Sequence, residues 1–256
     1  SPKAGLSYRL SDKNQVYVTV SKGFRAGGLT PLAADPSQVP LSPFKPEYST
    51  SWEAGSKNSF LNGKWIVNFD LFHTVINDLQ VPTLLLPDGI TVIRNSGKLL
   101  SVGAELEGSY LPLRNLSIDY ALGLTRAKFQ SFIPSSAGPG GQATDLKGNR
   151  QVFTPDKTIL LAVQYGIDLN QKKNSQAWAR AEWHHTGKIY FDVLNTISQD
   201  PYNIYNLRAG VTFRDLEFSL WGRNITGEKY IAYAYDFGAV HLGNPATWGI
   251  SLKKKF

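Results

Sequence analysis

The sequence predicts an all-β fold, a portion of an antiparallel transmembrane β-barrel with about eleven strands. Two observations carry this prediction. Long polar connections alternate with short turns along the chain, which is the asymmetry between the two rims of such a barrel. Between the connections, apolar and polar residues alternate with a period of two, as they do along a strand whose two faces meet different surroundings.

The connections divide the chain into the predicted strands. The short ones are mostly rich in Gly, Pro, Asn or Asp, which favour turns, and they are expected at Ser11–Asn14, Leu61–Gly63, Pro112–Asn115, Ile167–Ser175 and Arg214–Asp215. The long ones hold Gly, Pro, Ser or Asn clusters that suit an irregular path in water, and they cover Arg25–Pro46, Leu79–Gly97, Gln130–Asp156, Gly187–Pro201 and Gly227–Pro245.

The alternation sorts each strand into an apolar face and a polar face. After the first turn, for example, Val16, Val18 and Val20 point one way while Tyr17 and Thr19 point the other. A soluble antiparallel sandwich with one wet face shows the same pattern. The barrel is favoured because the segments can supply the roughly 9–11 residues of a tilted transmembrane strand. Aromatic residues near segment ends also suit the girdles at the two membrane interfaces: Tyr48, Trp52, Phe60, Tyr110, Tyr165, Trp183, Tyr205, Phe213 and Trp248.

Composition excludes several classes of protein. With 42% hydrophobic and 12% aromatic residues in 256, the chain is not disordered. No run approaches the roughly 18 apolar residues of a spanning helix, so only a closed barrel could cross lipid with its backbone paired. The absence of Cys excludes disulfides. The net charge is +7, but basic residues are scattered apart from Lys253–Lys255, so no nucleic-acid partner is expected.

Five short motifs follow one another in a characteristic order and spacing. They are Ser21–Gly28, Lys45–Glu47 running on to Trp52–Lys57, Asn95–Gly97 followed by Gly103–Gly108, Arg223–Tyr230, and Gly243–Pro245 leading to Trp248–Leu252. Together they resemble the C-terminal half of the barrel of a TonB-dependent outer-membrane receptor. The resemblance covers nearly the whole chain.

The resemblance implies a barrel of about 22 strands that is filled by an N-terminal plug domain. It also implies a TonB box that engages the TonB–ExbB–ExbD motor of the inner membrane. Residues 1–256 are therefore expected to be the C-terminal part of the barrel, without the plug domain and the TonB box. Ser1 leads directly into a strand with no signal peptide, which also favours a mature form or a fragment. The strand number agrees, because an antiparallel meander closes only with an even number of strands.

The end of the chain is similar to the closing strand of this family, which carries a signal for the barrel-assembly machinery. The residues that match the signal alternate back from the terminal aromatic: Trp248, Ile250, Leu252 and Phe256. Lys254 departs from the pattern. Its charge is tolerable if the side chain reaches the periplasmic interface.

The last long connection concentrates side chains that suit a ligand. By the resemblance, substrate contacts belong to the external rim and the upper lumen. The expected contacts are Tyr230, Tyr233, Tyr235, Asp236, Phe237 and His241, with Arg25 above the second strand as a cation for an anionic ligand. An aromatic siderophore, a corrinoid or a sugar would suit these groups about equally. Girdle positions or ordinary loop packing would explain the same residues.

Few residues in the sequence are arranged in a pattern that suits catalysis or metal binding. Glu105 and Glu107 share a face, as glycosidase carboxylates do, but in a wet lumen they are expected to pair with neighbouring cations or with the plug. His184 and His185 point to opposite faces and cannot chelate together. A ladder of lumen charges is expected instead at Arg180, Glu182 and His184. We therefore predict no enzymatic activity, no metal site and no cofactor.

The resemblance implies an active importer of a scarce solute in the outer membrane of a Gram-negative bacterium, with a ferric siderophore as the expected solute. Its partners would be outer-membrane lipid, TonB–ExbB–ExbD through the N-terminal part, the barrel-assembly machinery and a metal–siderophore complex. Two alternatives stay open. A passive or substrate-specific porin needs a closed barrel and no plug, and a secreted glycan-binding β-protein would purify without detergent.

Overall fold

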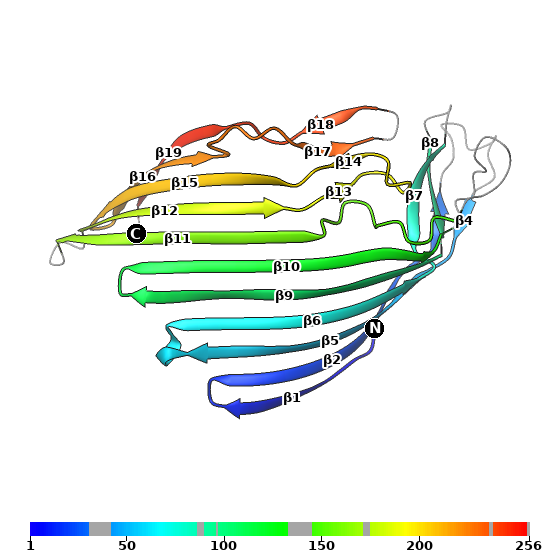
Figure 1. Ribbon diagram of the computed structural model, residues 1–256, viewed down its shortest axis with the longest axis horizontal. Helices are drawn as coiled ribbons and strands as arrows, with labels where there is room; N and C mark the ends of the chain where they lie inside the picture. The colour runs from blue at the N-terminus through cyan, green and yellow to red at the C-terminus, as the bar shows by residue number, and fades with distance from the viewer. Residues whose placement is uncertain are drawn as a thin grey trace.

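One antiparallel sheet of eleven strands dominates the computed structural model, which describes residues 1–30, 42–85, 90–95, 97–132, 145–170, 175–235 and 238–254. The strands follow the order of the chain, and Figure 1 shows them side by side. They are β1 (Lys3–Ser11), β2 (Asn14–Arg25), β5 (Glu47–Phe60), β6 (Trp65–Asn77), β9 (Lys98–Leu113), β10 (Leu116–Ser131), β11 (Lys157–Asn170), β12 (Ser175–Thr186), β15 (Tyr202–Phe213), β16 (Leu216–Arg223) and β19 (Thr247–Lys254).

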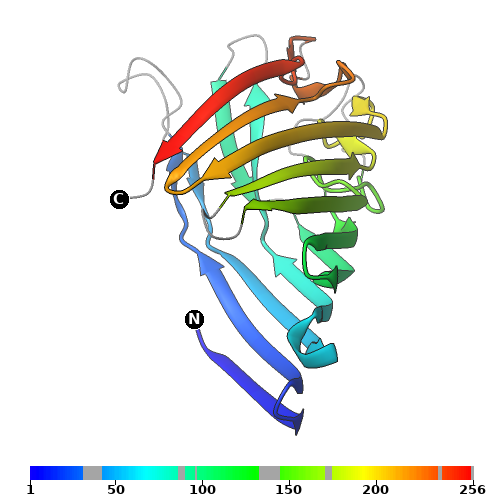
Figure 2. The ribbon, with the colours of Figure 1, turned by 90° about the vertical axis from the view of Figure 1, so that its left-hand side faces the viewer.

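The sheet is curved and open (Figure 2). Its two edges are β1 and β19, and each has one partner strand within the described chain. The predicted all-β wall of eleven antiparallel strands is therefore confirmed. Because lipid cannot satisfy free backbone groups, a membrane-spanning form of this wall needs further strands at both edges.

The four short turns that the structure describes lie at one end of the sheet, as predicted, with small shifts in their bounds (Figure 1). β9 continues to Leu113, so the turn expected to begin at Pro112 begins later. β11 continues to Asn170, and residues 171–174 of the connection expected at Ile167–Ser175 lie outside the described residues. The two strands extend in this way because their backbone groups still pair with the neighbouring strand, as in the pair Ile167↔Ala177.

The long connections are not wholly irregular, so this expectation is wrong in four of the five. Each of these four contains a two-stranded hairpin, which pairs backbone groups that extend beyond the sheet. The hairpins are β3 (Gly28–Thr30) with β4 (Ser42–Phe44), β7 (Gln80–Leu85) with β8 (Ile90–Asn95), β13 (Ile189–Tyr190) with β14 (Ser198–Gln199), and β17 (Ile231–Ala234) with β18 (Val240–Leu242).

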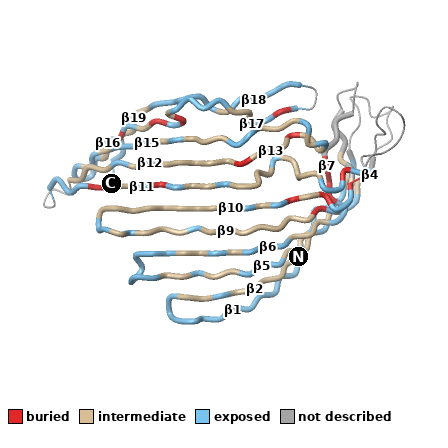
Figure 3. Tube along the Cα trace, in the orientation of Figure 1, coloured by how far each residue is buried: buried red, intermediate tan, exposed pale blue. Residues whose placement is uncertain are grey.

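The register places all nine predicted girdle aromatics on the apolar face of the sheet. Near the turns, the Trp65 ring lies 5.6 Å from the Phe60 ring and 6.0 Å from the Tyr110 ring. The Trp65 indole N–H also donates to the Tyr120 hydroxyl at 3.0 Å. Figure 3 shows that most of the wall is exposed or half-buried, as expected for a single layer with one apolar face outward.

The last strand places the expected assembly residues on this apolar face. Trp248, Ile250 and Leu252 are 65%, 68% and 73% exposed, and they lie opposite Gly222, Leu220 and Phe218 of β16. Lys254 follows at the turn end of the same face, opposite Leu216. Phe256 lies outside the described residues.

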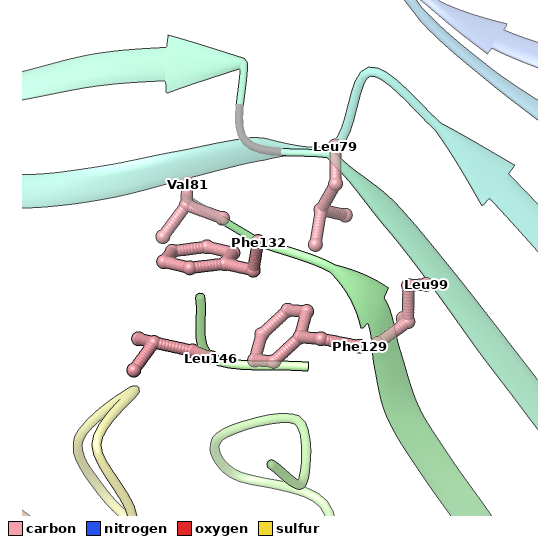
Figure 4. Packing of buried hydrophobic residues seen from close by; sticks show 6 residues of the cluster. All are labelled: Leu79, Val81, Leu99, Phe129, Phe132 and Leu146. Atoms are coloured by element: carbon pink, nitrogen blue, oxygen red, sulfur yellow. The ribbon is translucent and has the colours of Figure 1, made fainter. Parts of the chain in front are cut away.

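A compact buried cluster lies at the rim that carries the long connections. It consists of Leu79, Val81, Leu99, Phe129, Phe132 and Leu146 (Figure 4). The Phe129 and Phe132 rings are 4.7 Å apart. Side chains from two long connections thus pack on the upper ends of β9 and β10. The large buried apolar side chains of this cluster are sealed from solvent at the rim because two layers of chain meet there.

Buried amide side chains fasten the bases of the connections. Asn224, which is 4% exposed and has φ of 48°, ends β16. Its amide donates to the carbonyls of Glu228 and Asn244 at 2.9 and 3.0 Å and accepts from the Glu228 N–H at 2.9 Å. These bonds tie both ends of the last connection to one residue. They give a physical reason for Asn in the Arg223–Tyr230 motif.

We predict that Leu71→Arg blocks insertion of the barrel, whereas Asn68→Arg on the same strand does not. Leu71 lies at the centre of β6 on the apolar face, where an Arg near the membrane midplane costs roughly 2–4 kcal/mol. Asn68 lies on the polar face and donates to the Glu107 carboxylate at 3.1 Å, so Arg would find an ion-pair partner there. Heat-modifiable migration of the protein from membranes measures folding. Equal folding of the two variants would contradict the face assignment.

We also predict that Asn224→Ala lowers the melting temperature of the folded barrel. It removes three hydrogen bonds of a buried amide, each of which contributes about 0.5–1.5 kcal/mol. Glu228→Ala is the matched control, because only the backbone of Glu228 takes part in these bonds. If both variants melt like the parent, the amide does not fasten the loop.

Candidate ligand-binding rim and lumen wall

Arg25, the predicted cation, ends β2 at the rim, and its backbone is fixed by a buried amide. The Gln80 side chain, 5% exposed, donates to the carbonyls of Ala26 at 2.9 Å, Lys45 at 3.0 Å and Arg25 at 3.4 Å. The Gln80 backbone N–H donates to the Glu47 carboxylate at 2.7 Å. One amide therefore joins the first two long connections and holds the backbone that carries Arg25.

The residues predicted in the last connection separate into two groups. Tyr230 stacks on Tyr202 of β15, with ring centres 4.2 Å apart and planes 12° from parallel. This contact is structural packing, and it anchors the connection to the wall. Tyr233, Tyr235 and His241 lie in or beside the β17–β18 hairpin and are exposed. Asp236 and Phe237 lie outside the described residues.

Tyr233 belongs to an aromatic cluster that three connections build together. Its ring stacks on Phe153 at 4.9 Å and 17°, and it contacts Tyr235 at 4.6 Å. Phe153 also contacts Phe191 at 5.7 Å. Phe191 is buried, whereas Phe153, Tyr233 and Tyr235 are 44%, 39% and 46% exposed. We call these four residues the rim aromatic cluster.

The sequence analysis missed Phe153 and Phe191. Both stand in polar connections, and no local pattern distinguishes them from loop residues that pack on their own neighbours. The one usable signal was the density of aromatic residues in the last connection, which found Tyr233 and Tyr235. Their partners come from connections that are distant in the sequence, so only the fold reveals them.

Hydrogen bonds join the three connections into one body. The Asn195 amide accepts from the Arg150 N–H at 2.6 Å and donates to the Arg150 carbonyl at 3.0 Å. The Phe153 N–H donates to the Tyr190 carbonyl at 2.9 Å. The Ile231 N–H donates to the Gln199 side chain at 2.7 Å, which ties the last hairpin to the same body. The rim aromatic cluster is thus held from three sides.

Arg25 lies far from this cluster along the sheet. It ends β2, whereas the last connection follows β16, and seven strands lie between these two in the sheet order. The structure therefore gathers Tyr233 and Tyr235 with new partners and leaves Arg25 on a separate part of the rim. A ligand that reached both would have to bridge the mouth of the barrel.

The polar face carries paired charges, as predicted. Arg180 donates to Asp119 at 2.8 Å and to Glu182 at 2.7 Å, and His184 lies 3.5 Å from Glu182. The Arg180–Asp119 pair passes over Ala162 of the intervening strand, which is fully buried. A larger residue at that position would separate the two charges. The predicted ladder of Arg180, Glu182 and His184 is therefore present.

A second polar contact between non-neighbouring strands also passes over a small residue. The Tyr17 hydroxyl donates to Glu53 at 2.9 Å and also contacts Asp70, across Gly55 of β5. A Cβ at position 55 would collide with both Tyr17 and Asp70, so glycine is required there. Tyr17 thus connects strands that are not neighbours, and the polar face gains contacts between β2 and β6.

The histidines behave as the strand geometry predicts. His185 lies on the apolar face and its ring nitrogen is 3.0 Å from the Asn203 side chain, whereas His184 meets Glu182 on the polar face. In the described ranges, no group of three or more His, Cys, Asp or Glu side chains is arranged to hold a metal ion.

Comparisons with known proteins identify the family to which this sheet belongs. A model of the family described as TonB dependent receptor-like, beta-barrel matches residues 1–225. The chain also resembles the ferric yersiniabactin uptake receptor FyuA from Yersinia pestis, with a TM-score of 0.80 and 22% identity over 99% of this chain and 37% of that chain.

Two further solved structures give the same result. The siderophore receptor PiuA from Acinetobacter baumannii has a TM-score of 0.74 and 18% identity over 99% of this chain and 35% of that chain. The ferric-catecholate import receptor Fiu from Escherichia coli K12, in its closed form, has a TM-score of 0.71 and 20% identity over 99% of this chain and 34% of that chain. The chain spans about a third of the length of these structures, and at such identity the likeness concerns the fold.

These relatives are receptors and transporters rather than enzymes. The family match covers most of the chain, and the curved antiparallel wall with one apolar face agrees with it. The chain belongs to the TonB-dependent receptors and forms part of their outer-membrane β-barrel.

Proposed function

We propose that this chain is the C-terminal part of the barrel of an active importer for a ferric siderophore. The plug domain and TonB box belong to the rest of the receptor, through which TonB–ExbB–ExbD supplies the energy. The single observation that carries the proposal is a family-typical wall whose rim presents an exposed aromatic cluster built by three connections. Aromatic surfaces of this kind suit large, partly apolar chelates.

The solved structures that this chain resembles support the choice of a ferric siderophore as the solute. Those with TM-scores of 0.80, 0.74 and 0.71 are receptors for ferric yersiniabactin, a siderophore and ferric catecholates. A passive porin fits less well, because the matching family and the similar solved structures are receptors. A soluble glycan binder would not expose Ile250 and Leu252 on a continuous apolar face.

Two further partners follow from the apolar face. Outer-membrane lipid covers it between the aromatic residues near both rims. The barrel-assembly machinery reads the last strand, where Trp248, Ile250 and Leu252 share that face. Phe256 completes the proposed signal. The Lys254 ammonium group reaches the periplasmic interface, since Lys254 lies at the turn end of β19.

The test of function is uptake of radioactive iron. We predict that cells with the complete receptor accumulate iron from at least one ferric siderophore, and that deletion of its TonB box or of the host's tonB function abolishes uptake. A porin would still pass its solute without TonB. Uptake that is indifferent to TonB, or binding of none of a panel of catecholate, phenolate and hydroxamate complexes, would contradict the proposal.

We predict that Tyr233→Ala with Tyr235→Ala weakens binding of the imported ferric complex at least tenfold and leaves barrel folding intact. A few aromatic anchors carry most of the binding energy in such sites, often about 2 kcal/mol or more each. Asp215→Ala, in the turn at the opposite end of the sheet, is the control and should bind like the parent. If calorimetry gives equal affinities for all three proteins, Tyr233 and Tyr235 serve only in packing.

A further inference from the structure

The apolar face of β10 becomes basic near the loop end of the strand. The side chains on this face are apolar from Ile118 to Leu124, and the next two are Arg126 and Lys128. The register puts Arg126 in the same cross-strand row as the girdle residue Trp52, which is three strands away. The two cations therefore stand at the height of the aromatic girdle, where the apolar band of the wall ends.

Two neighbouring segments place further cations beside them. Arg150, in the connection that follows β10, forms a β-bridge with Lys128. Lys157, the first residue of β11, is the cross-strand partner of Leu124. Partners in a ladder share a face, so all these side chains belong to the apolar face. We call these four residues the rim cations: Arg126, Lys128, Arg150 and Lys157.

The rim cations line one hollow together with apolar side chains of the wall. The apolar lining comes from β6, β9 and β10, and consists of Leu71, Val102, Ala104 and Leu124. Ala104 stands between its cross-strand partners Leu71 and Leu124, and its small side chain leaves space between these two larger ones. The hollow thus has a cationic end at the rim and an apolar end toward the middle of the strands.

The cationic end carries an excess of positive charge. Arg150 pairs with Asp156 at 2.9 Å, which compensates one of the rim cations. In the described part of the chain, no carboxylate forms an ion pair with Arg126, Lys128 or Lys157. Basic side chains at this depth lay their methylene groups along the apolar surface and direct their charges to the lipid headgroups. An anionic headgroup with an acyl chain complements both ends of the hollow.

We propose that this hollow binds a phosphorylated glycolipid of the outer leaflet, with an acyl chain over Ala104 and sugar phosphates against the rim cations. The hollow lies at the end of the sheet that carries the long connections (Figure 1). In an outer-membrane barrel this end is external, so the lipid that meets it belongs to the outer leaflet. The inference rests on the membrane placement of the wall and is independent of the imported solute.

Native mass spectrometry of the purified complete receptor, titrated with diphosphorylated lipid A, measures this binding. The parent is expected to bind lipid A at least tenfold more tightly than the dephosphorylated lipid, since each cation near an anionic lipid strengthens binding about fivefold. Lys128→Gln should weaken lipid A binding about fivefold, and combination with Arg126→Gln at least tenfold. Lys22→Gln is the matched control and should stay within twofold of the parent. Lys22 shares the face and the cross-strand row of Lys128, four strands away.

Ala104→Phe tests the acyl chain separately, because it fills the apolar end and changes no charge. It should weaken lipid A binding at least threefold, while heat-modifiable migration shows a folded barrel. Parallel titrations use phosphatidylglycerol and inorganic phosphate, and the parent should bind both at least tenfold more weakly than lipid A.

Three results would overturn the proposal. Equal affinity of the parent for lipid A and the dephosphorylated lipid would exclude recognition of the phosphates, and equal affinity for phosphatidylglycerol would exclude a glycolipid site. Equal losses in Lys22→Gln and Lys128→Gln would show that charge attracts lipid without a site. Inorganic phosphate that binds as tightly as lipid A, with no effect of Ala104→Phe, would show a simple anion site. All of these results leave the proposed import of iron standing.

Discussion

The antiparallel backbone ladder from β1 to β19 is the constraint on which the rest of the structure depends. Within lipid no water can satisfy a free backbone group, so every strand must pair along its length. Pairing fixes the register, and the register decides which side chains share a face. A slip by one residue would move Val67 to the polar face and Asn68 to the apolar face.

The ladder also explains where small residues are needed. A polar side chain that reaches a strand beyond its neighbour must pass over the strand between them. Ala162 lies beneath the Arg180–Asp119 pair, and Gly55 lies beneath the Tyr17–Asp70 contact. These contacts connect non-neighbouring strands on the polar face without adding a second layer. The wall therefore stiffens laterally while it remains one sheet thick.

A wall of one layer has little buried apolar core, and the described chain gathers its sealed cluster at the rim. There the cluster around Phe129 and the amides of Gln80, Asn195 and Asn224 give each connection a fixed base. Without these hydrogen bonds, the backbone N–H and carbonyl groups of a long loop would not hold the loop in one conformation. A ligand site on such loops is preorganised, which reduces the entropy lost when a ligand binds.

Much of this architecture could be predicted because its causes are local. The alternation around Val16 and Tyr17 predicted which side chains share a face of the sheet. The turn residues Arg214 and Asp215 predicted a short connection with the correct bounds. The hairpins in the long connections were missed because each is too short for a periodic signal. Phe153 was missed because its backbone N–H bonds to Tyr190 and its ring stacks on Tyr233, and both partners are distant in the sequence.

The central claim is that a rigid wall presents the rim aromatic cluster to a ferric chelate. The most direct measurement is the anomalous X-ray signal of iron in crystals of the complete receptor with its bound ferric siderophore. The account predicts that the iron lies beside the rim aromatic cluster, with the chelate in contact with Phe153 or Tyr233. Iron seated elsewhere, with no contact between the chelate and this cluster, would contradict it.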